Sequence, residues 1–276
     1  NSKSFDRPVL IHCLTKKGKG YIPAELRPDK FHGTGAFHIQ TGENKSKAKY
    51  PSYTSIFAKT LIKMAKEDER LLGITAAMPS GTGIGEFAKV FPRRSFDVGI
   101  AEQHAVLFAA GLAKAGMIPV APIYSSFLQR AYDQIIEDVC IQNQHVIFGV
   151  DRAGLVGADG ETHHGVFDLS YLSSIPNMTV FAPADGAQLE EMLEYAVKNM
   201  NSPVAIRYPR GSSKFDHLKL KAFTGTNIKL SDGADITIFA VGNMLDTALD
   251  AARELMSKGY DVGVTNVCVV SPFEED

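Results

Sequence analysis

The sequence predicts an α/β protein in which a largely parallel sheet is covered by helices on both faces. Short apolar runs alternate along the chain with longer stretches whose apolar residues recur at helical spacing. Strands and helices that alternate at this spacing are typical of parallel strands joined by crossover helices. The chain has 276 residues, of which 45% are hydrophobic, and this suffices for a large core.

The middle of the chain carries the clearest pattern. We expect strands at residues 71–77, 96–100, 118–124, 146–151, 179–182 and 204–208. Between them we expect helices at residues 56–66, 102–115, 127–142 and 188–199. The last helix has a capping box, Asp185-x-x-Gln188, whose side chains can satisfy N–H groups of the first turn.

Both ends of the chain are expected to belong to further units. The apolar segment 8–14 is typical of a strand, and beyond a polar stretch at 211–221 we expect a strand at 235–241, a helix at 243–258 and a strand at 261–270. The expected domains are the tail of one domain at 1–33, a linker at 34–49, a whole α/β domain at 50–210, a linker at 211–234 and the start of another domain at 235–276. Because the chain starts at Asn1 without an initiator methionine and stops just after a strand, we expect it to be an excerpt of a longer protein.

Composition excludes several classes of protein. The 29 Lys and Arg residues against 31 Asp and Glu residues give a net charge of −2, so there is no basic excess to hold a polyanion. The mean hydropathy of −0.05 and the lack of an apolar run of about 18 residues argue against a membrane span. Cys13, Cys140 and Cys268 lie far apart in apolar segments, which favours free, buried thiols and a reducing compartment over a disulfide framework or a zinc site.

Polar residues just after the predicted strands are the candidates for a site, because ligands collect at the carboxyl ends of parallel strands. Glu102 begins an apolar helix: it is either a carboxylate favoured by the helix dipole or a functional carboxylate in dry surroundings that needs a hydrogen-bonding partner. Tyr124 and Phe127 place two aromatic rings after the next strand, although the spacing of Phe127 also fits simple core packing. Arg130 and Asp133 are spaced as a solvated ion pair.

The polar loop at residues 151–165 holds four glycines and the adjacent histidines His163 and His164. Loops of this length inside a compact domain are often functional. Adjacent histidines do not easily face one metal ion, and no third ligand is spaced nearby, so we expect no metal site here and favour a proton-transfer or hydroxyl-binding role for His163. Arg152, in the same loop, and Arg210, after the last strand of the middle domain, either converge on one anion or are surface charges.

The glycines at residues 81–85 follow the first predicted strand of the middle domain and open a short helix, as in a turn that cradles a phosphate. Their spacing is G-x-G-x-G and not the dinucleotide fingerprint G-x-G-x-x-G. A plain flexible loop is therefore the alternative to a nucleotide site.

Four segments taken together resemble the 1-deoxy-D-xylulose-5-phosphate synthase family: AEQHA at 101–105, YSSFLQRAYDQ at 124–134, DRAGLVGADGETHHG at 151–165 and RYPRG at 207–211. The segment TKKGKGY at 15–21 and the downstream Phe31-His32 resemble the end of the family's first domain. The resemblance implies a transketolase-like fold, with a thiamine-diphosphate-binding domain of the pyrimidine type and the start of a transketolase C-terminal-like domain.

The resemblance also implies an activity. Enzymes of this family use thiamine diphosphate and Mg²⁺ to condense pyruvate with D-glyceraldehyde 3-phosphate, with loss of carbon dioxide. The product, 1-deoxy-D-xylulose 5-phosphate, is a precursor of isoprenoids, thiamine and pyridoxal. A cytoplasmic homodimer (plastidial in a plant or alga), with no nucleic-acid or membrane partner, is implied as well.

Individual roles follow by the same resemblance. Glu102 protonates the aminopyrimidine ring nitrogen, so that the cofactor's own amine becomes the base that generates its carbon nucleophile. Phe127 stacks on the aminopyrimidine, and Tyr21 contacts the cofactor. His32 and His163 handle hydroxyl and carboxylate protons. The acceptor, with its phosphate on the two arginines, is bound by Tyr124, Arg152, Asp159 and Arg210.

One departure from the family pattern is that its glycine-Asp…Asn motif for magnesium and the diphosphate does not occur in this sequence. We therefore expect the 276 residues alone to hold no metal ligands, to carry only the aminopyrimidine end of the cofactor site and to be inactive. The alternatives are a β-type subunit of a thiamine-dependent 2-oxoacid dehydrogenase, an NAD-binding dehydrogenase that uses residues 81–85, and a non-catalytic interaction fragment.

Overall fold

The computed structural model describes residues 2–45 and 48–273, and the chain divides into two compact units after residue 47. The first unit holds the short helices η1 (Ser2–Ser4) and α1 (Ile22–Leu26). The rings of Tyr21, Phe31 and Phe37 pack together with centroids 5.1–5.8 Å apart. A β-bridge joins Phe37 to Asn44 in the polar stretch of this unit.

The strand predicted at residues 8–14 is wrong. This segment is extended and exposed, and it pairs with no other segment that the structure describes. An apolar sequence forms a strand only when a neighbour takes up its backbone N–H and C=O groups, and none of the described residues of the first unit does so.

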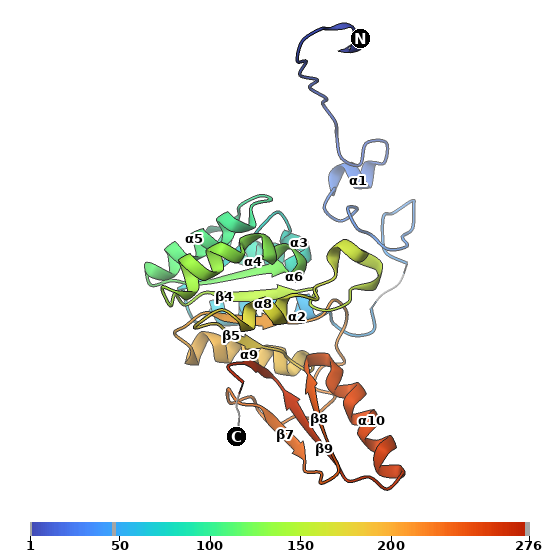
Figure 1. The fold of residues 1–276 in the computed structure, drawn as a ribbon. Coiled ribbons are helices and arrows are strands. Elements are labelled where there is room, and N and C mark those ends of the chain that lie inside the picture. The colour runs from blue at the N-terminus through green and yellow to red at the C-terminus, as the bar shows by residue number, and fades with distance from the viewer. Residues whose placement is uncertain (1, 46–47, 274–276) are drawn as a thin grey trace. The chain divides into compact units, whose positions relative to one another are not determined.

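The second unit is built on a seven-stranded sheet, which Figure 1 shows with helices on both sides. Its strands are β1 (Leu71–Thr75), β2 (Ser95–Asp97), β3 (Ile118–Tyr124), β4 (Ile147–Asp151), β5 (Thr179–Phe181), β6 (Val204–Arg207) and β10 (Val269–Ser271). They lie in the order β10-β5-β6-β4-β3-β1-β2. All neighbours are parallel except β10, which runs antiparallel to β5. The predicted fold class is confirmed.

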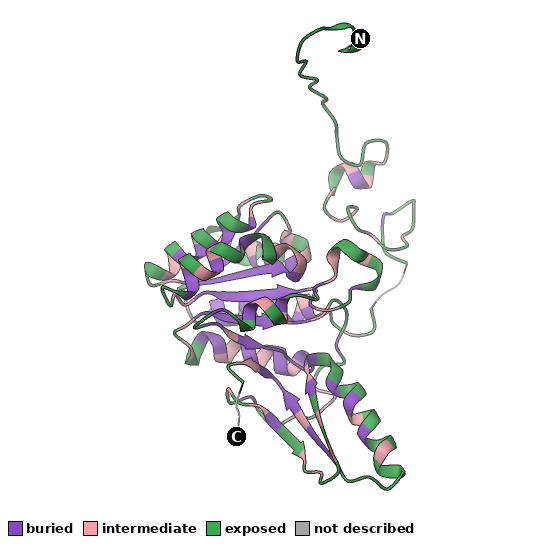
Figure 2. Cartoon of the chain, in the orientation of Figure 1, coloured by how far each residue is buried: buried purple, intermediate pink, exposed green. Residues whose placement is uncertain are grey.

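Two apolar cores lie on opposite faces of this sheet, because successive residues of a strand point to opposite sides. In β4, Ile147 belongs to one core and Phe148 to the other. The first core is covered by α2 (Tyr53–Ala65), α4 (Ile84–Val90) and α9 (Gly186–Asn199), and the second by α5 (Glu102–Lys114), the helical segment from Ser125 to Cys140 and α8 (Asp168–Ser173). Figure 2 shows the buried strands between helices that keep exposed outer faces.

Short helical turns lie in the loops of this unit: α3 (Pro79–Thr82), η2 (Pro92–Arg94), η5 (Gly157–Asp159) and η6 (Glu161–His163).

The helix predicted at residues 127–142 is not one regular helix. It consists of α6 (Ser125–Leu128), η3 (Gln129–Ala131), α7 (Tyr132–Gln134) and the π-helical η4 (Ile135–Cys140). Ala131 interrupts the helix, with φ −101° and ψ 22°. The apolar spacing marks the buried face correctly but carries no signal for a change of helix type.

A smaller three-stranded sheet follows, with the order β7-β9-β8. It comprises β7 (Ile228–Ser231), β8 (Ile236–Val241) and β9 (Val262–Val267), and α10 (Leu245–Ser257), preceded by η7 (Gly242–Met244), packs against it. The single strand predicted at 261–270 is wrong, because this run divides into β9 in the small sheet and β10 in the large one. Strand β7 was not predicted.

Polar contacts join α9 to the small sheet's helix. Asp185 is the N-cap of α9 and accepts from Gln188 N at 3.0 Å, as the sequence predicts. The Gln188 side chain accepts from Ala184 N at 2.8 Å and so caps one residue earlier than in a capping box. His217 lies between Asp185, at 3.7 Å, and Asp246 of α10, at 2.6 Å.

Cys140 and Cys268 are buried as expected, whereas Cys13 is exposed in the unpaired segment of the first unit. The prediction of three buried thiols is therefore wrong for Cys13. Within the described parts of the chain, none of the helices has the length and apolar character that crossing a bilayer requires.

Candidate active site

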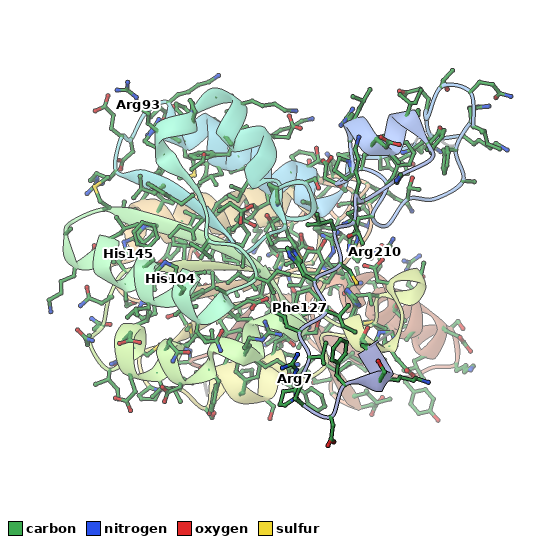
Figure 3. All side chains as sticks on the ribbon, turned by 90° about the horizontal axis from the view of Figure 1, so that it is seen from above. Arg7, Arg93, His104, Phe127, His145 and Arg210 are labelled. Atoms are coloured by element: carbon green, nitrogen blue, oxygen red, sulfur yellow. The ribbon has the colours of Figure 1, made fainter. Side chains whose placement is uncertain are left out.

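The register of the central strands places several functional side chains at one edge of the sheet. Tyr124 at the end of β3 is paired with Asp151 at the end of β4, and Val150 of β4 is paired with Arg207 at the end of β6. In Figure 3, Arg93 and His145, which precede strands, lie toward one side of the domain, and Phe127 and Arg210, which follow strands, lie toward the other. The candidate residues are thus brought to the carboxyl edge, where parallel sheets carry their ligands.

Glu102 is the first residue of α5 and is only 3% exposed. Its Oε2 accepts a hydrogen bond from Arg130 Nη1 at 2.9 Å, and the other oxygen, Oε1, accepts none from the residues that the structure describes. A carboxylate this deeply buried is stable only with a partner. The site therefore contains a buried carboxylate, Glu102, whose Oε2 is hydrogen-bonded to Arg130 and whose Oε1 can accept a hydrogen bond from a ligand.

Arg130 was predicted to pair with Asp133, and this is wrong. The guanidinium pairs with Glu102, 28 residues earlier in the chain, and the Asp133 side chain accepts from Gln134 instead. The turn at η3 directs the Arg130 side chain toward the start of α5. An ion pair stabilises the buried carboxylate of Glu102 more than it would stabilise a solvated carboxylate such as that of Asp133.

Three rings form an aromatic cluster beside this edge. Tyr124 and Phe127 stack with centroids 5.5 Å apart and an interplanar angle of 19°. The ring of His163 meets Phe127 edge to face at 5.1 Å. A small pocket of about 340 Å³ lies over Phe127 and is also lined by Ser126, Gln129 and Arg130. The half-buried Phe127 is therefore not a simple core residue, because one side of its surroundings is open.

Arg152 is held in an uncommon backbone conformation, with φ +59°, immediately after β4. Its Nη1 donates to Gly81 O at 2.7 Å, to Asp151 Oδ2 at 2.9 Å and to Thr54 Oγ1 at 3.2 Å. The guanidinium also lies over the ring of Tyr124, 4.1 Å from its centroid. A left-handed, non-glycine residue persists only where its surroundings fix it, and such residues gather at functional sites.

The two arginines converge, as one of the two sequence interpretations expected. Asp159 lies between them, with Oδ2 2.9 Å from Arg210 Nε and 3.9 Å from Arg152 Nε. The Arg152 Nε atom is buried and has no hydrogen-bond partner among the described residues. The carboxylate of Asp159 thus occupies a position between two guanidinium groups, where another anion could also bind.

A cavity of about 630 Å³ opens beside these arginines. It is bounded by the start of α2, by the turn at α3 and by the chain after β6. The polar residues that line it are Ser52, Thr54, Ser55, Lys59, Ser80, Glu86, Arg152, Arg210 and Ser212. Three cations against one carboxylate make this cavity suited to an anionic group.

The glycines at residues 81–85 serve close packing at this cavity. A Cβ atom at Gly81 would lie 2.2 Å from the hydroxyl oxygen of Tyr124, and Gly83 adopts φ +82° between α3 and α4. Gly81 also presents its carbonyl oxygen to Arg152. Gly81 is therefore required by the approach of Tyr124, and Gly83 by its left-handed backbone and by the approach of Ala58. The dinucleotide-binding hypothesis did not foresee this packing role.

Gly81→Ala is expected to displace Tyr124, because the new methyl group would overlap its hydroxyl oxygen. A buried aromatic ring cannot shift by about 1 Å without moving the residues packed around it. We expect this overpacking to lower the free energy of unfolding by about 1–3 kcal/mol and to lower activity more than stability alone explains. Gly111→Ala in α5 is the matched control, since a Cβ there meets no atom within 4 Å. Chemical denaturation of both variants tests this, and equal stability of the two would contradict it.

Asp151 makes the stability of the fold depend on pH. Burial raises the pKa of Asp151 to about 6, although Arg152 and Thr54 act in the opposite direction. An unfolded aspartate has a pKa of about 3.9. The folded state therefore holds the proton more tightly. The contribution of protonated Asp151 to the free energy of unfolding is largest below about pH 4, and it is lost as the pH rises through 6.

We expect the free energy of unfolding of the wild type, relative to Asp151→Asn, to fall by about 2 kcal/mol between pH 4 and pH 7. Denaturant titrations of both proteins across this range measure the difference. A difference that stays constant, or that grows with pH, would contradict the assignment.

The other predicted site residues are placed as follows. His164 is structural, because its Nδ1 accepts from Val156 N at 3.1 Å. Tyr21 and His32 lie in the first unit, where Tyr21 donates to Ile39 O at 2.7 Å and His32 is exposed. Their roles toward a cofactor stay predictions.

Asp151 and Thr54 were not predicted as site residues. Asp151 could have been found as a polar residue that ends an apolar strand, whereas nothing in the sequence relates Thr54 to residues a hundred positions away. No cluster of three or more His, Cys, Asp or Glu side chains suited to a metal ion occurs among the residues described.

Comparisons with known proteins agree with the predicted fold class. Residues 49–214 match the family model "Transketolase, pyrimidine binding domain", and residues 225–276 match "Transketolase, C-terminal domain". The chain is 52% identical, over 98% of its length, to a 1-deoxy-D-xylulose-5-phosphate synthase from Pelotomaculum thermopropionicum, and 52% identical, over its whole length, to one from Natranaerobius thermophilus. The chain spans only 42% and 44% of these two relatives.

Among solved structures, a split-gene transketolase described as an inactive β4 tetramer aligns with a TM-score of 0.69 and 32% identity, over 79% of this chain and 71% of that one. A transketolase from Campylobacter jejuni aligns with a TM-score of 0.72, over 83% of this chain and 37% of that one, and at 22% identity it supports the fold alone. Neither a 2-oxoacid dehydrogenase subunit nor an NAD-binding dehydrogenase is favoured by these comparisons.

Proposed function

Because this chain belongs to the transketolase pyrimidine-binding domain family, we propose that it is part of an enzyme that condenses pyruvate with D-glyceraldehyde 3-phosphate and releases carbon dioxide. The product would be 1-deoxy-D-xylulose 5-phosphate. The observation that carries the proposal is the buried Glu102, with a free Oε1, next to the arginine that lines the pocket over Phe127.

These residues fit the pyrimidine ring of thiamine diphosphate. The ring offers a basic nitrogen, and Oε1 of Glu102 is an acceptor that no described residue occupies. Phe127 supplies an aromatic face beside an open pocket. Because no metal-ligating cluster is found among the described residues, we assign no residue of this chain to Mg²⁺ or to the diphosphate.

When bound, thiamine diphosphate supplies the carbon nucleophile that the reaction needs. Glu102, whose side chain is only 4% exposed, would hold a proton at Oε1 for the ring nitrogen. Phe127 holds the plane of the ring. His163, packed against Phe127, is placed to give or take a proton at the substrate's carboxylate or hydroxyl group.

Arg152 and Arg210 bind the acceptor's phosphate, and Asp159 is displaced from between them when the phosphate enters. Tyr124 fixes the plane of Arg152 through its ring. We also propose that the whole protein is a cytoplasmic homodimer, as the family resemblance implies.

The test uses the full-length protein with thiamine diphosphate, Mg²⁺, pyruvate and either D-glyceraldehyde 3-phosphate or unphosphorylated D-glyceraldehyde. We expect 1-deoxy-D-xylulose 5-phosphate as product, and a KM for the unphosphorylated acceptor that is raised about 10- to 100-fold. Arg210→Met should remove most of that discrimination. Transfer of the acetyl group to a lipoyl acceptor, without any use of the triose, would instead identify a 2-oxoacid dehydrogenase subunit.

A further inference from the structure

We propose that Arg130 is a positioning residue for Glu102: it holds one carboxylate oxygen so that the other is presented to the cofactor's ring nitrogen. This inference rests on the proposed function of Glu102. No role for Arg130 beyond a solvated ion pair follows from the sequence.

The contact is specific in geometry. Arg130 Nη1 donates to Glu102 Oε2 at 2.9 Å, and this is the one hydrogen bond that any described residue gives to the Glu102 side chain. The two residues come from separate elements, η3 and the first turn of α5. The Glu102 side chain is 4% exposed, whereas that of Arg130 is 53% exposed. The pair thus spans the boundary between the buried acid and the open pocket over Phe127, which Arg130 also lines.

A buried carboxylate with two equivalent oxygens has no intrinsic preference for the one that meets a ligand. A hydrogen bond from a guanidinium to Oε2 removes this ambiguity and restricts rotation of the side chain. It leaves Oε1 as the acceptor for the ring nitrogen. Arginine keeps its proton at every physiological pH, so Arg130 orients the acid without competing in the proton transfer.

Two other roles for Arg130 predict different outcomes. A merely exposed ion pair would affect neither cofactor binding nor turnover. A direct substrate contact would change the KM for pyruvate or for the triose. A positioning role changes the cofactor's affinity and kcat together, and it leaves the substrate KM values nearly unchanged.

The experiment compares Arg130→Gln and Arg130→Lys with the wild-type, full-length protein. Arg253→Gln is the control, because Arg253 forms an exposed ion pair within α10, away from the site. Calorimetric titration of the apoprotein with thiamine diphosphate and Mg²⁺ gives Kd, and steady-state rates give kcat and KM. For Arg130→Gln we expect Kd to rise and kcat to fall, each about 10- to 100-fold. Arg130→Lys should recover part of both, and Arg253→Gln should match the wild type.

A double-mutant cycle isolates the coupling. In a Glu102→Gln background, Arg130→Gln should not weaken cofactor binding further, because the carboxylate that it positions is already gone. An equal loss in both backgrounds would overturn the proposal, and so would wild-type Kd and kcat in Arg130→Gln. If Arg130→Gln does not fold, Arg130→Lys decides: wild-type values in that variant would overturn the proposal. Full activity of Glu102→Gln would instead contradict the proposed function itself.

Discussion

Glu102→Gln in the full-length protein is expected to lower kcat about 10²- to 10⁴-fold, the usual contribution of a positioned acid or base. The substitution keeps the size of the side chain and an oxygen that can accept from Arg130, so the fold should persist. What it removes is the group that shares a proton with the ring nitrogen. Rates of carbon dioxide release and of product formation measure the effect.

Glu137→Gln is the matched control, because Glu137 is an exposed carboxylate on η4, in the segment that follows Arg130. It should retain wild-type turnover. Near wild-type kcat in Glu102→Gln, with the melting temperature unchanged, would show that the buried acid has no part in the reaction.

Arg207→Ala is expected to lower the free energy of unfolding by about 3–5 kcal/mol. Arg207 at the end of β6 donates from Nε to Asp168 Oδ2 at 2.8 Å, and Asp168 at the start of α8 is 1% exposed. Removal of the cation leaves a buried carboxylate without its charged partner. Urea unfolding followed by circular dichroism measures the loss.

The control for this pair is Arg253→Ala, which breaks an exposed pair within α10 and should change stability little. The double replacement Arg207→Met/Asp168→Leu should recover much of the lost stability, because it removes the unpaired charge and fills the space with apolar atoms. A loss in Arg207→Ala no larger than that in Arg253→Ala would contradict the assignment.

The sequence predicts most closely those elements whose pattern and packing are local. Strand β3 begins at Ile118 and ends at Tyr124, as its apolar run indicates, and Asp185 caps α9 as its spacing to Gln188 predicts. In both cases the signal and its physical cause lie within a few residues of each other.

The errors arise where a distant partner decides the outcome. Residues 8–14 have the pattern of a strand but pair with none of the described residues of their unit. The run 261–270 divides between two sheets because its second half pairs with β5. Apolar periodicity reports which side of a segment is buried and does not report what it is buried against.

The candidate site shows the same limit. The position of Glu102, Phe127 and Arg152 after predicted strands placed them at one edge of the sheet, and each follows a strand in the structure. Their roles toward a cofactor or substrate stay predictions. The partners of these residues required three-dimensional contact: Arg130 reaches Glu102 across 28 positions, and Thr54 reaches Arg152 across 98. Sequence spacing alone assigned Arg130 to Asp133, which is its neighbour on an ideal helix but not on the interrupted one.

The most direct test is a crystal structure of the full-length protein with thiamine diphosphate and Mg²⁺. We predict that the ring nitrogen opposite the amino group lies about 2.6–3.2 Å from Glu102 Oε1, with the ring of Phe127 against the pyrimidine face and Arg130 still on Oε2. A pyrimidine bound elsewhere, with Glu102 in contact with Arg130 alone, would contradict the central claim that this buried acid activates the cofactor.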